Sequence, residues 1–335
     1  MKKFIALLSV LFLSAALVAC DNGGEDTTIT IGANIYTFGD NFMNGVVRPA
    51  LEDYADHLGV VIDIVDSEND QGKLNDQVDV FIESGVDVLC INLVDPAAAG
   101  TIIEKAKAAD IPLILYNKEA TVEGVMATYD KVWYVGTNSA QSGIIQGDMM
   151  LADWQANPSW DKNGDGKVQY VLLKGESGHP DAEARTTFAV KSFTDAGIEV
   201  EELALKDSST WNTQEALDTM ASWITSYGDS IELVISNNDG MAFGAITAME
   251  TAGVDFPVYG VDALDQALQH IKDGEMNGTV LNDGVNQARA TLDLAVNAAR
   301  GVDVTFATAW ELDNTTTKAV RVDYLAVTPE NVDEF

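Results

Sequence analysis

The sequence predicts an α/β protein with two lobes, each built on a doubly wound parallel sheet. Three observations support this fold class. From Thr28 onward, strand-like runs alternate with amphipathic stretches typical of helices, and a second such series begins at Val132. Many of the strand-like runs are continuously apolar, as at 88–93, which indicates strands buried on both faces. Such strands separated by helices form parallel sheets that are covered by helices on both sides.

The first series opens with a strand over 28–36, where Thr and Ile alternate before an apolar stretch. A helix is expected over 41–58, because its apolar residues recur at helical spacing. The alternation then continues with strands at 60–65, 86–93 and 112–117 and with helices at 74–83 and 96–109.

The second series consists mostly of short runs rich in Val, Ile and Leu, several of them bounded by Gly, Asn or Asp. The expected strands are at 132–136, 168–174, 198–204, 233–237, 258–261 and 278–281. Two series in one chain predict two lobes.

Length and charge limit the possible functions. The chain has 335 residues, enough for two domains with ordinary cores. It carries 53 Asp and Glu against 19 Lys and Arg, a formal net charge of −34. Since nucleic-acid binding depends on neutralising phosphates, no nucleic-acid partner is expected. A hydrophobic content of 47% indicates a folded, strongly solvated protein.

The first residues are typical of an export signal. Lys2 and Lys3 precede an apolar core over 4–17 that is too short to span a membrane and ends in small residues. Cys20 follows Leu-Val-Ala directly and resembles the bacterial lipoprotein box, in which the Cys becomes the lipidated N-terminus; an ordinary signal peptide is the alternative. We expect a signal peptide at 1–19, a lipidated Cys20 and a tether to residue 27, and therefore an exported, membrane-anchored protein, periplasmic or at the cell surface.

The second cysteine, Cys90, lies in an apolar run and is expected to be a buried core thiol. With Cys20 lipidated, no disulfide is expected.

Polar residues follow six of the predicted strands, where ligands bind in open parallel sheets. Carboxylates accept hydroxyl protons, and amide and guanidinium groups donate, so this cleft suits a neutral polyhydroxylated ligand. Phe42 and Trp211 lie near these ends and suit the apolar C–H faces of a sugar. The polar segments are 36–42, 117–119, 175–179, 237–239, 260–262 and 282–283.

Residues 161–169 have the spacing of the first nine positions of a calcium loop. Asp161, Asn163 and Asp165 supply hard oxygen ligands at alternate positions, and Gly166 permits the sharp turn. The twelfth position, where a helix-coupled sensor carries a bidentate Glu, is Leu172. The pattern predicts a structural calcium site in a loop that leads into a strand. Its last carboxylate ligand would come from a residue outside the loop.

Longer segments closely resemble the galactose/glucose-binding proteins of bacterial sugar ABC transporters. These segments are 41–43, 69–71, 91–100, 117–119, 142–148, 179–187, 260–264 and 278–283, and the likeness runs from about residue 28 to the end. The resemblance implies a type I periplasmic-binding-protein fold with three hinge crossings. It implies one lobe of 28–136 plus 284–318 and another of 137–283 plus 319–335.

The resemblance also implies capture of D-galactose or D-glucose, delivery to an ABC permease and ATPase, and a monomeric protein. The residues implied for polar contacts with the sugar are Asp40, Asn117, His179, Asp181, Arg185, Asn238, Asp262 and Asn282. Phe42 and Trp211 are implied to sandwich the pyranose ring, and Tyr36 to line the site. The implied Ca²⁺ ligands are Asp161, Asn163, Asp165, the Lys167 carbonyl, Gln169 and a remote bidentate carboxylate, Glu232.

Simpler explanations remain for single residues. Asp262 is also suited to cap the helix that begins near Leu264, and Asn238 to a turn. His179 alone would more often be structural, but Asp181 and Arg185 beside it favour ligand contact.

Other functions are disfavoured. No Gly-x-Gly-x-x-Gly turn follows a strand, and no Ser/His/Asp set or open metal site is evident, so no enzyme is expected. A sugar-responsive repressor would begin with a basic helix-turn-helix, where this chain has an export signal. A sensor that presents sugar to a chemoreceptor remains an alternative and is compatible with transport.

Overall fold

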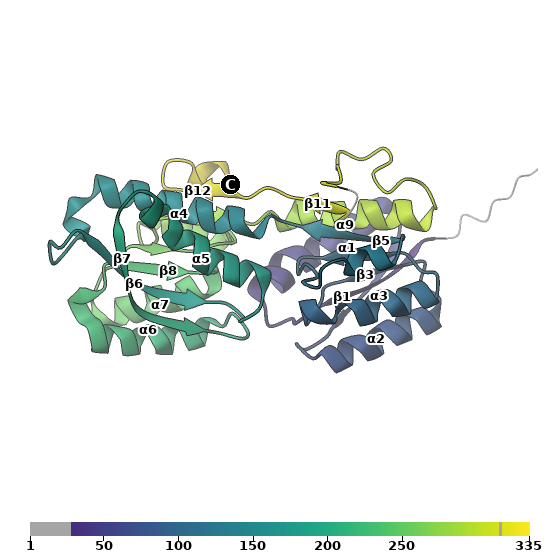
Figure 1. The fold of residues 1–335 in the computed structure, drawn as a ribbon, viewed down its shortest axis with the longest axis horizontal. Coiled ribbons are helices and arrows are strands. Elements are labelled where there is room, and N and C mark those ends of the chain that lie inside the picture. The colour runs from purple at the N-terminus through teal and green to yellow at the C-terminus, as the bar shows by residue number, and fades with distance from the viewer. Residues whose placement is uncertain (1–27, 315–316) are drawn as a thin grey trace, which may run out of the picture.

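A computed structural model describes residues 28–314 and 317–335. They form two lobes that lie end to end (Figure 1). The expected signal peptide, Cys20 and the tether lie outside the described residues. Within the described ranges, no helix combines the length and apolar character needed to cross a bilayer.

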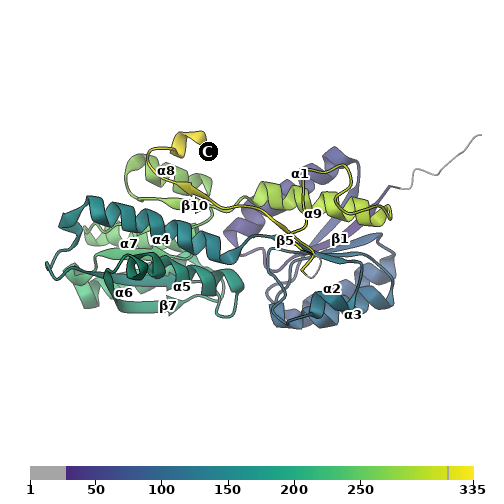
Figure 2. The same ribbon diagram turned by 45° about the horizontal axis from the view of Figure 1, so that its top comes forward.

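The first lobe is built on a six-stranded parallel sheet in the order β11-β5-β4-β3-β1-β2. Its strands are β1 (Thr30–Ile35), β2 (Val61–Asp66), β3 (Val88–Ile91), β4 (Leu113–Tyr116), β5 (Val132–Gly136) and β11 (Ala319–Arg321). β3 and β4 are buried along their whole length, as their apolar runs predict. Helices α1 (Arg48–Leu58) and α9 (Gly284–Ala299) cover one face, and α2 (Gln71–Ser84) and α3 (Ala99–Ala108) cover the other (Figure 2).

The second lobe has a parallel sheet in the order β7-β6-β8-β9, extended by the antiparallel pair β10–β12. Its strands are β6 (Lys167–Lys174), β7 (Glu199–Asp207), β8 (Leu233–Ser236), β9 (Val258–Tyr259), β10 (Thr279–Leu281) and β12 (Leu325–Val327). Helix α4 (Ser139–Ala156) packs against α5 (Pro180–Asp195), and α6 (Thr213–Tyr227) packs against α7 (Asp239–Ala252). Helix α8 (Asp265–Asp273) lies near the C-terminus.

The helix expected over 41–58 is present but is not α-helical throughout. Its first part is η1 (Met43–Val47), a π-helical turn, and α1 follows with Pro49 in its first turn. Pro49 has no N–H to donate to the carbonyl of Gly45, so the regular α-helical pattern is interrupted there.

The chain passes between the lobes three times, after β5, after β10 and after β11. The second lobe was expected to resume at residue 319, and this boundary is wrong. Ala319–Arg321 forms β11 and pairs in parallel with β5 of the first lobe, which covers the edge of that sheet. The third crossing therefore comes after Arg321.

Candidate functional site

A small cavity lies between the lobes at the carboxyl ends of both sheets. All ten side chains implied for sugar contact line it. The lining residues are Asp40, Phe42, Met43, Asn117, His179, Asp181, Arg185, Trp211, Asn238, Asp262 and Asn282. Met43 was not expected, although it directly follows Phe42. The side chains come from the segments that follow seven strands in two lobes, so the strand-end pattern brings distant segments together as expected.

In the first lobe, hydrogen bonds fix Asp40 and Asn117. Asp40 accepts the N–H of Met43 through Oδ1 (2.8 Å) and the hydroxyl of Tyr36 through Oδ2 (2.6 Å). Asn117 has φ 61° and accepts from Asn92 Nδ2 at 3.2 Å. Tyr36 therefore lies behind Asp40 and does not line the cavity, contrary to the expectation, because its hydroxyl is used to hold that carboxylate.

In the second lobe, His179 caps helix α5: its Nδ1 accepts the N–H of Asp181 at 3.1 Å. Burial lowers the pKa of His179 well below its usual value, and the positive charges of Lys118 and Arg185 lower it further. The ring is therefore neutral at pH 7, with Nε2 as its N–H donor. Asp181 in turn accepts from Ser139 Oγ at 2.5 Å.

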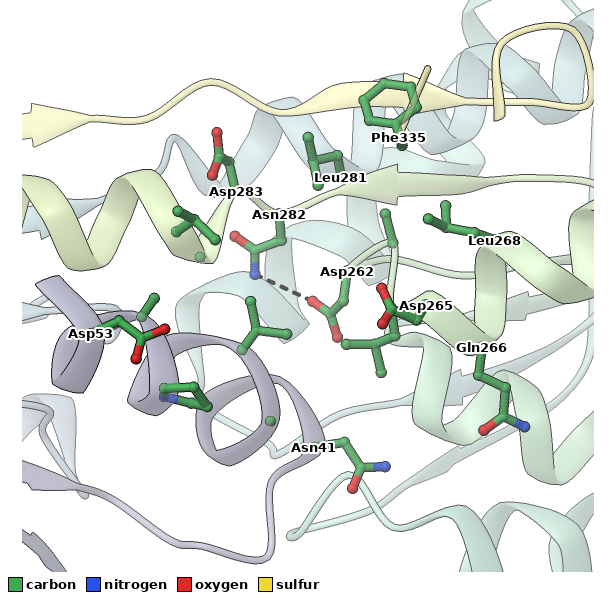
Figure 3. A pocket seen from close by; sticks show the side chains of 18 of the residues that line it. Asn41, Asp53, Asp262, Asp265, Gln266, Leu268, Leu281, Asn282, Asp283 and Phe335 are labelled. Atoms are coloured by element: carbon green, nitrogen blue, oxygen red, sulfur yellow. Dashed lines mark hydrogen bonds between the residues drawn. The ribbon is translucent and has the colours of Figure 1, made fainter. Parts of the chain in front are cut away.

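Asp262 and Asn282 form the wall nearest the second crossing. Gln287 Nε2 donates to Asn282 Oδ1 (2.7 Å), and Asn282 Nδ2 donates to Asp262 Oδ1 at 3.2 Å (Figure 3). Burial raises the pKa of Asp262 well above its usual value; Arg185 acts in the opposite direction, and the neighbouring carboxylate of Asp239 adds to the rise. A buried carboxylate of this kind is stabilised by hydroxyl donors from a ligand.

Asp262 and Asn238 differ in whether they cap a helix. Asp262 does not cap α8, whose N-cap is Leu264 without a side-chain hydrogen bond. Asn238 does cap α7, because its Oδ1 accepts the N–H of Met241 at 2.9 Å, and it also lines the cavity.

The position of the Trp211 indole depends on the absence of a side chain at Gly175. A Cβ on Gly175 would lie 2.1 Å from Trp211 Cη2, so only a residue without a side chain lets the indole lie there. Trp211 has φ 54° and meets His179 edge-on, with ring centroids 5.3 Å apart. Together with Asn117 and Asp262 (φ 127°), it is one of three cavity residues in backbone conformations that side chains rarely adopt. Such strain is concentrated at functional sites.

A wider groove of about 1240 Å³ adjoins this cavity (Figure 3). Asp262 and Asn282 line both spaces, so their hydrogen-bonded pair separates them. The groove is bounded by α1 on one lobe and by α8 and Phe335 on the other, and its width therefore depends on how the lobes are turned.

The loop 161–169 has the internal hydrogen bonds of a folded cation loop. Asp161 accepts the N–H groups of Gly164 and Gly166, at 2.8 and 3.0 Å. Glu232 lies across from the loop and accepts the N–H groups of Lys162 (2.7 Å) and Gln169 (3.1 Å). Over the described residues, no three or more carboxylate, His or Cys side chains are placed to hold a metal by themselves. Amide and carbonyl oxygens of the loop would have to contribute.

Two observations favour a cation here. Gln169 Oε1 is buried and has no hydrogen-bond partner among the described atoms. Burial raises the pKa of Glu232, and the charge of Asp161 adds to the rise, although backbone N–H groups oppose it. A cation would stabilise both oxygens, so the residues present fit calcium.

Sequence reasoning missed Ser139, Tyr324 and Gln287, which hold cavity side chains, and Lys118, which pairs with Glu176 next to the cavity. Lys118 stands inside the Asn117–Glu119 segment that carries the resemblance, but its partner is remote. The others have no local pattern that marks them.

Comparison with known proteins gives three findings. A family model described as a periplasmic binding protein domain matches residues 31–303. The chain is 44% identical over 337 residues to the D-galactose/methyl-galactoside binding periplasmic protein MglB of Haemophilus influenzae, with 100% of this chain and 99% of the relative covered.

Solved structures match as well. An ABC transporter solute binding protein from Bacillus halodurans C-125 with bound myo-inositol has a TM-score of 0.76 and 28% identity, covering 93% of this chain and 98% of that one. A periplasmic solute binding protein from Actinobacillus succinogenes 130z with bound D-allose shares the fold, with a TM-score of 0.78 and 22% identity over 92% of this chain and 100% of that one.

Proposed function

This chain belongs to the periplasmic binding protein family, and from that premise we propose that it captures D-galactose or D-glucose between its lobes and delivers it to an ABC importer. The expected two-lobed α/β fold and the resemblance to sugar-binding members are confirmed. That the bound sugar is a hexose, D-galactose or D-glucose, is our inference.

One observation carries the proposal: ten polar and aromatic side chains from both lobes meet around a single cavity. Asp40, Asp181 and Asp262 supply hydroxyl acceptors, while Arg185 and the amides supply donors. Phe42 and Trp211 supply the aromatic surfaces that suit the C–H faces of a pyranose. No catalytic role is proposed.

Sugar binding in this cavity favours closure of the two lobes. A sugar that touches both lobes favours the closed state by the contacts it makes only there, and this difference turns the hinge. Hydrogen bonds to charged partners contribute about 1.5–3 kcal/mol each. Several of them, less the ordering cost, reach the −8 kcal/mol or so of a micromolar complex.

The test is calorimetric titration of a monosaccharide panel. Asp262→Ala should weaken hexose binding by about tenfold or more, because ring hydroxyls would be buried without an acceptor. Asp265→Ala is the matched control, since Asp265 lines the outer groove but not the cavity. Galactose and glucose differ at one hydroxyl, and a carboxylate such as Asp40 accepts from either orientation, so both should bind. Ribose binding more tightly than both hexoses would overturn the proposal.

We also propose that a calcium ion is held by Asp161, Asn163, Asp165, the Lys167 carbonyl, Gln169 and Glu232. The support is the hard oxygen set and the buried, unpartnered Gln169 Oε1. When bound, the ion would supply positive charge that stabilises the second lobe, at affinities of about 10⁻⁷–10⁻⁵ M for loops of this kind.

Finally, we propose that the mature protein begins at a lipidated Cys20 and is held at a membrane surface. The support is the Leu-Val-Ala-Cys ending behind a short apolar core. More than one acyl chain gives stable anchoring.

A further inference from the structure

Tyr324 lies in the third crossing, between β11 and β12, and its side chain is 2% exposed. Its phenol oxygen accepts hydrogen bonds from Arg185 Nη2 (3.1 Å) and from Thr137 Oγ1 (2.9 Å). Thr137 lies in the first crossing, between β5 and α4. One hydroxyl therefore joins two of the three crossings to a side chain of the cavity wall.

Arg185 is held by three acceptors. Besides Tyr324, its Nε donates to Ser142 Oγ (3.3 Å) and its Nη1 donates to the carbonyl of Asn237 at 2.9 Å. A guanidinium has five N–H donors, so these three bonds leave two for a ligand. Because the group is planar, fixing one N–H on each nitrogen also fixes the direction of the other two.

We infer that Tyr324 is a positioning residue for sugar recognition, which orients Arg185 and ties that orientation to the crossings about which the lobes turn. The inference rests on the proposed sugar-binding function. In the open protein, water supplies an acceptor for Arg185 Nη2. When the lobes close on a sugar, water is excluded and the phenol oxygen is the hydrogen-bond acceptor of Nη2, since Asp181 Oδ2 lies farther from it, at 3.6 Å. Loss of that oxygen therefore penalises the closed state more than the open state.

The protonation state of the Tyr324 phenol agrees with a role in orienting Arg185. Burial raises the pKa of Tyr324 to about 12, and the charge of Asp181 adds to the rise. The side chain is therefore a neutral hydroxyl at physiological pH, so the bond to Arg185 joins a charged donor to a neutral acceptor. Such a bond is directional and does not depend on pH in the neutral range.

Tyr324→Phe removes the oxygen and keeps the ring. We expect galactose and glucose to bind about tenfold more weakly. Thr137→Val is the matched control: it removes the other partner of the same hydroxyl but leaves the acceptor of Arg185 in place, so binding should weaken less than about threefold. Equal affinities of Tyr324→Phe and the unaltered protein would overturn the inference.

Monodeoxy sugars separate a positioning role from a general structural one. If Tyr324 acts through Arg185, the loss caused by Tyr324→Phe should shrink only for deoxygalactoses that lack a hydroxyl met by Arg185 and persist for the others. A loss of the same size for every analogue would contradict the inference. If the unaltered protein bound no hexose, the proposed function would fail instead.

A measurement on the unaltered protein covers the case in which Tyr324→Phe does not fold. Nitrogen NMR of the Arg185 guanidinium, assigned with Arg185→Lys, should show two separate Nη signals in the sugar complex, since a held guanidinium does not rotate. A single averaged signal would show that Arg185 is not fixed and would overturn the inference.

Discussion

Lys118 and Glu176 form an ion pair across the cleft, with Lys118 Nζ 2.6 Å from Glu176 Oε2. Lys118 follows β4 in the first lobe, and Glu176 follows β6 in the second. The Lys118 side chain is fully buried, and its ammonium lies 3.8 Å from the centroid of the Tyr36 ring, the residue that holds Asp40. Burial lowers the pKa of Lys118, and Glu176 opposes that shift. Because the two residues belong to different lobes, we expect the pair to form only when the lobes are closed.

Glu176→Gln should therefore weaken hexose binding without removing a sugar contact. The closed state would bury the Lys118 ammonium without its anionic partner, while the open state would leave it hydrated. We expect a loss of about tenfold or more by calorimetry. Asp110→Asn is the control, since it removes the partner of the exposed Lys131 on the first lobe. Unchanged affinity in Glu176→Gln would show that the pair does not contribute to closure.

Gly175→Ala should displace Trp211, because the added Cβ would meet the indole at 2.1 Å. Sugar affinity should fall by about tenfold or more, since the aromatic surface moves away from the ring. Gly45→Ala is a suitable comparison, because a Cβ there meets nothing within 4 Å. Calorimetry with tryptophan fluorescence would follow both effects, and equal behaviour of the two variants would contradict the placement of Trp211.

The pKa of His179 predicts how stability depends on pH. Its folded pKa lies well below its usual value because of burial, so below about pH 6.5 the unfolded chain binds a proton that the folded protein does not. His179 therefore lowers the free energy of unfolding as the pH falls. His179→Asn keeps a capping acceptor but does not titrate, so without sugar its melting temperature should fall less between pH 7 and pH 5 than that of the unaltered protein. His57→Asn, at an exposed position, is the control. If the melting temperature of His179→Asn fell with pH as steeply as that of the unaltered protein, the lowered pKa of His179 would be contradicted.

Chelation should lower the melting temperature if calcium binds at 161–169. An ion present at about 100 times its Kd stabilises the folded state by about 2.7 kcal/mol, or about 5 °C or more for a lobe of this size. Glu232→Ala should abolish the response to added calcium, while Glu250→Ala, at an exposed helix position, should keep it. A response that survives in Glu232→Ala would remove Glu232 from the site.

Mass spectrometry of the native N-terminus tests the anchor. We expect an acyl-modified Cys20 as the first residue, and Cys20→Ser should release the protein from membranes. An unmodified Cys20, or cleavage at another residue, would exclude the lipoprotein assignment.

The sequence predicts the site well where the signal is local. The strands β1 to β10 fall within the expected strand-like runs or overlap them, and most of the cavity residues lie in the polar segments that follow those strands. It fails where a contact joins remote segments. Tyr324 and Arg185 are 139 residues apart, and Lys118 and Glu176 are 58 apart. No periodicity marks such pairs. The position of β11 was missed for the same reason, since its three residues become a strand only beside β5.

The late position of β11 has a consequence for the order of folding. Synthesis starts at the N-terminus, so β1 to β5 are available first, but the sixth strand of that sheet is Ala319–Arg321. The second lobe likewise requires β12, because without it one edge of β10 has no strand to pair with. Neither lobe can be completed until almost the whole chain is available, and both then finish within a few residues of each other. We therefore expect folding to be completed only after synthesis, which would suit export across a membrane before folding.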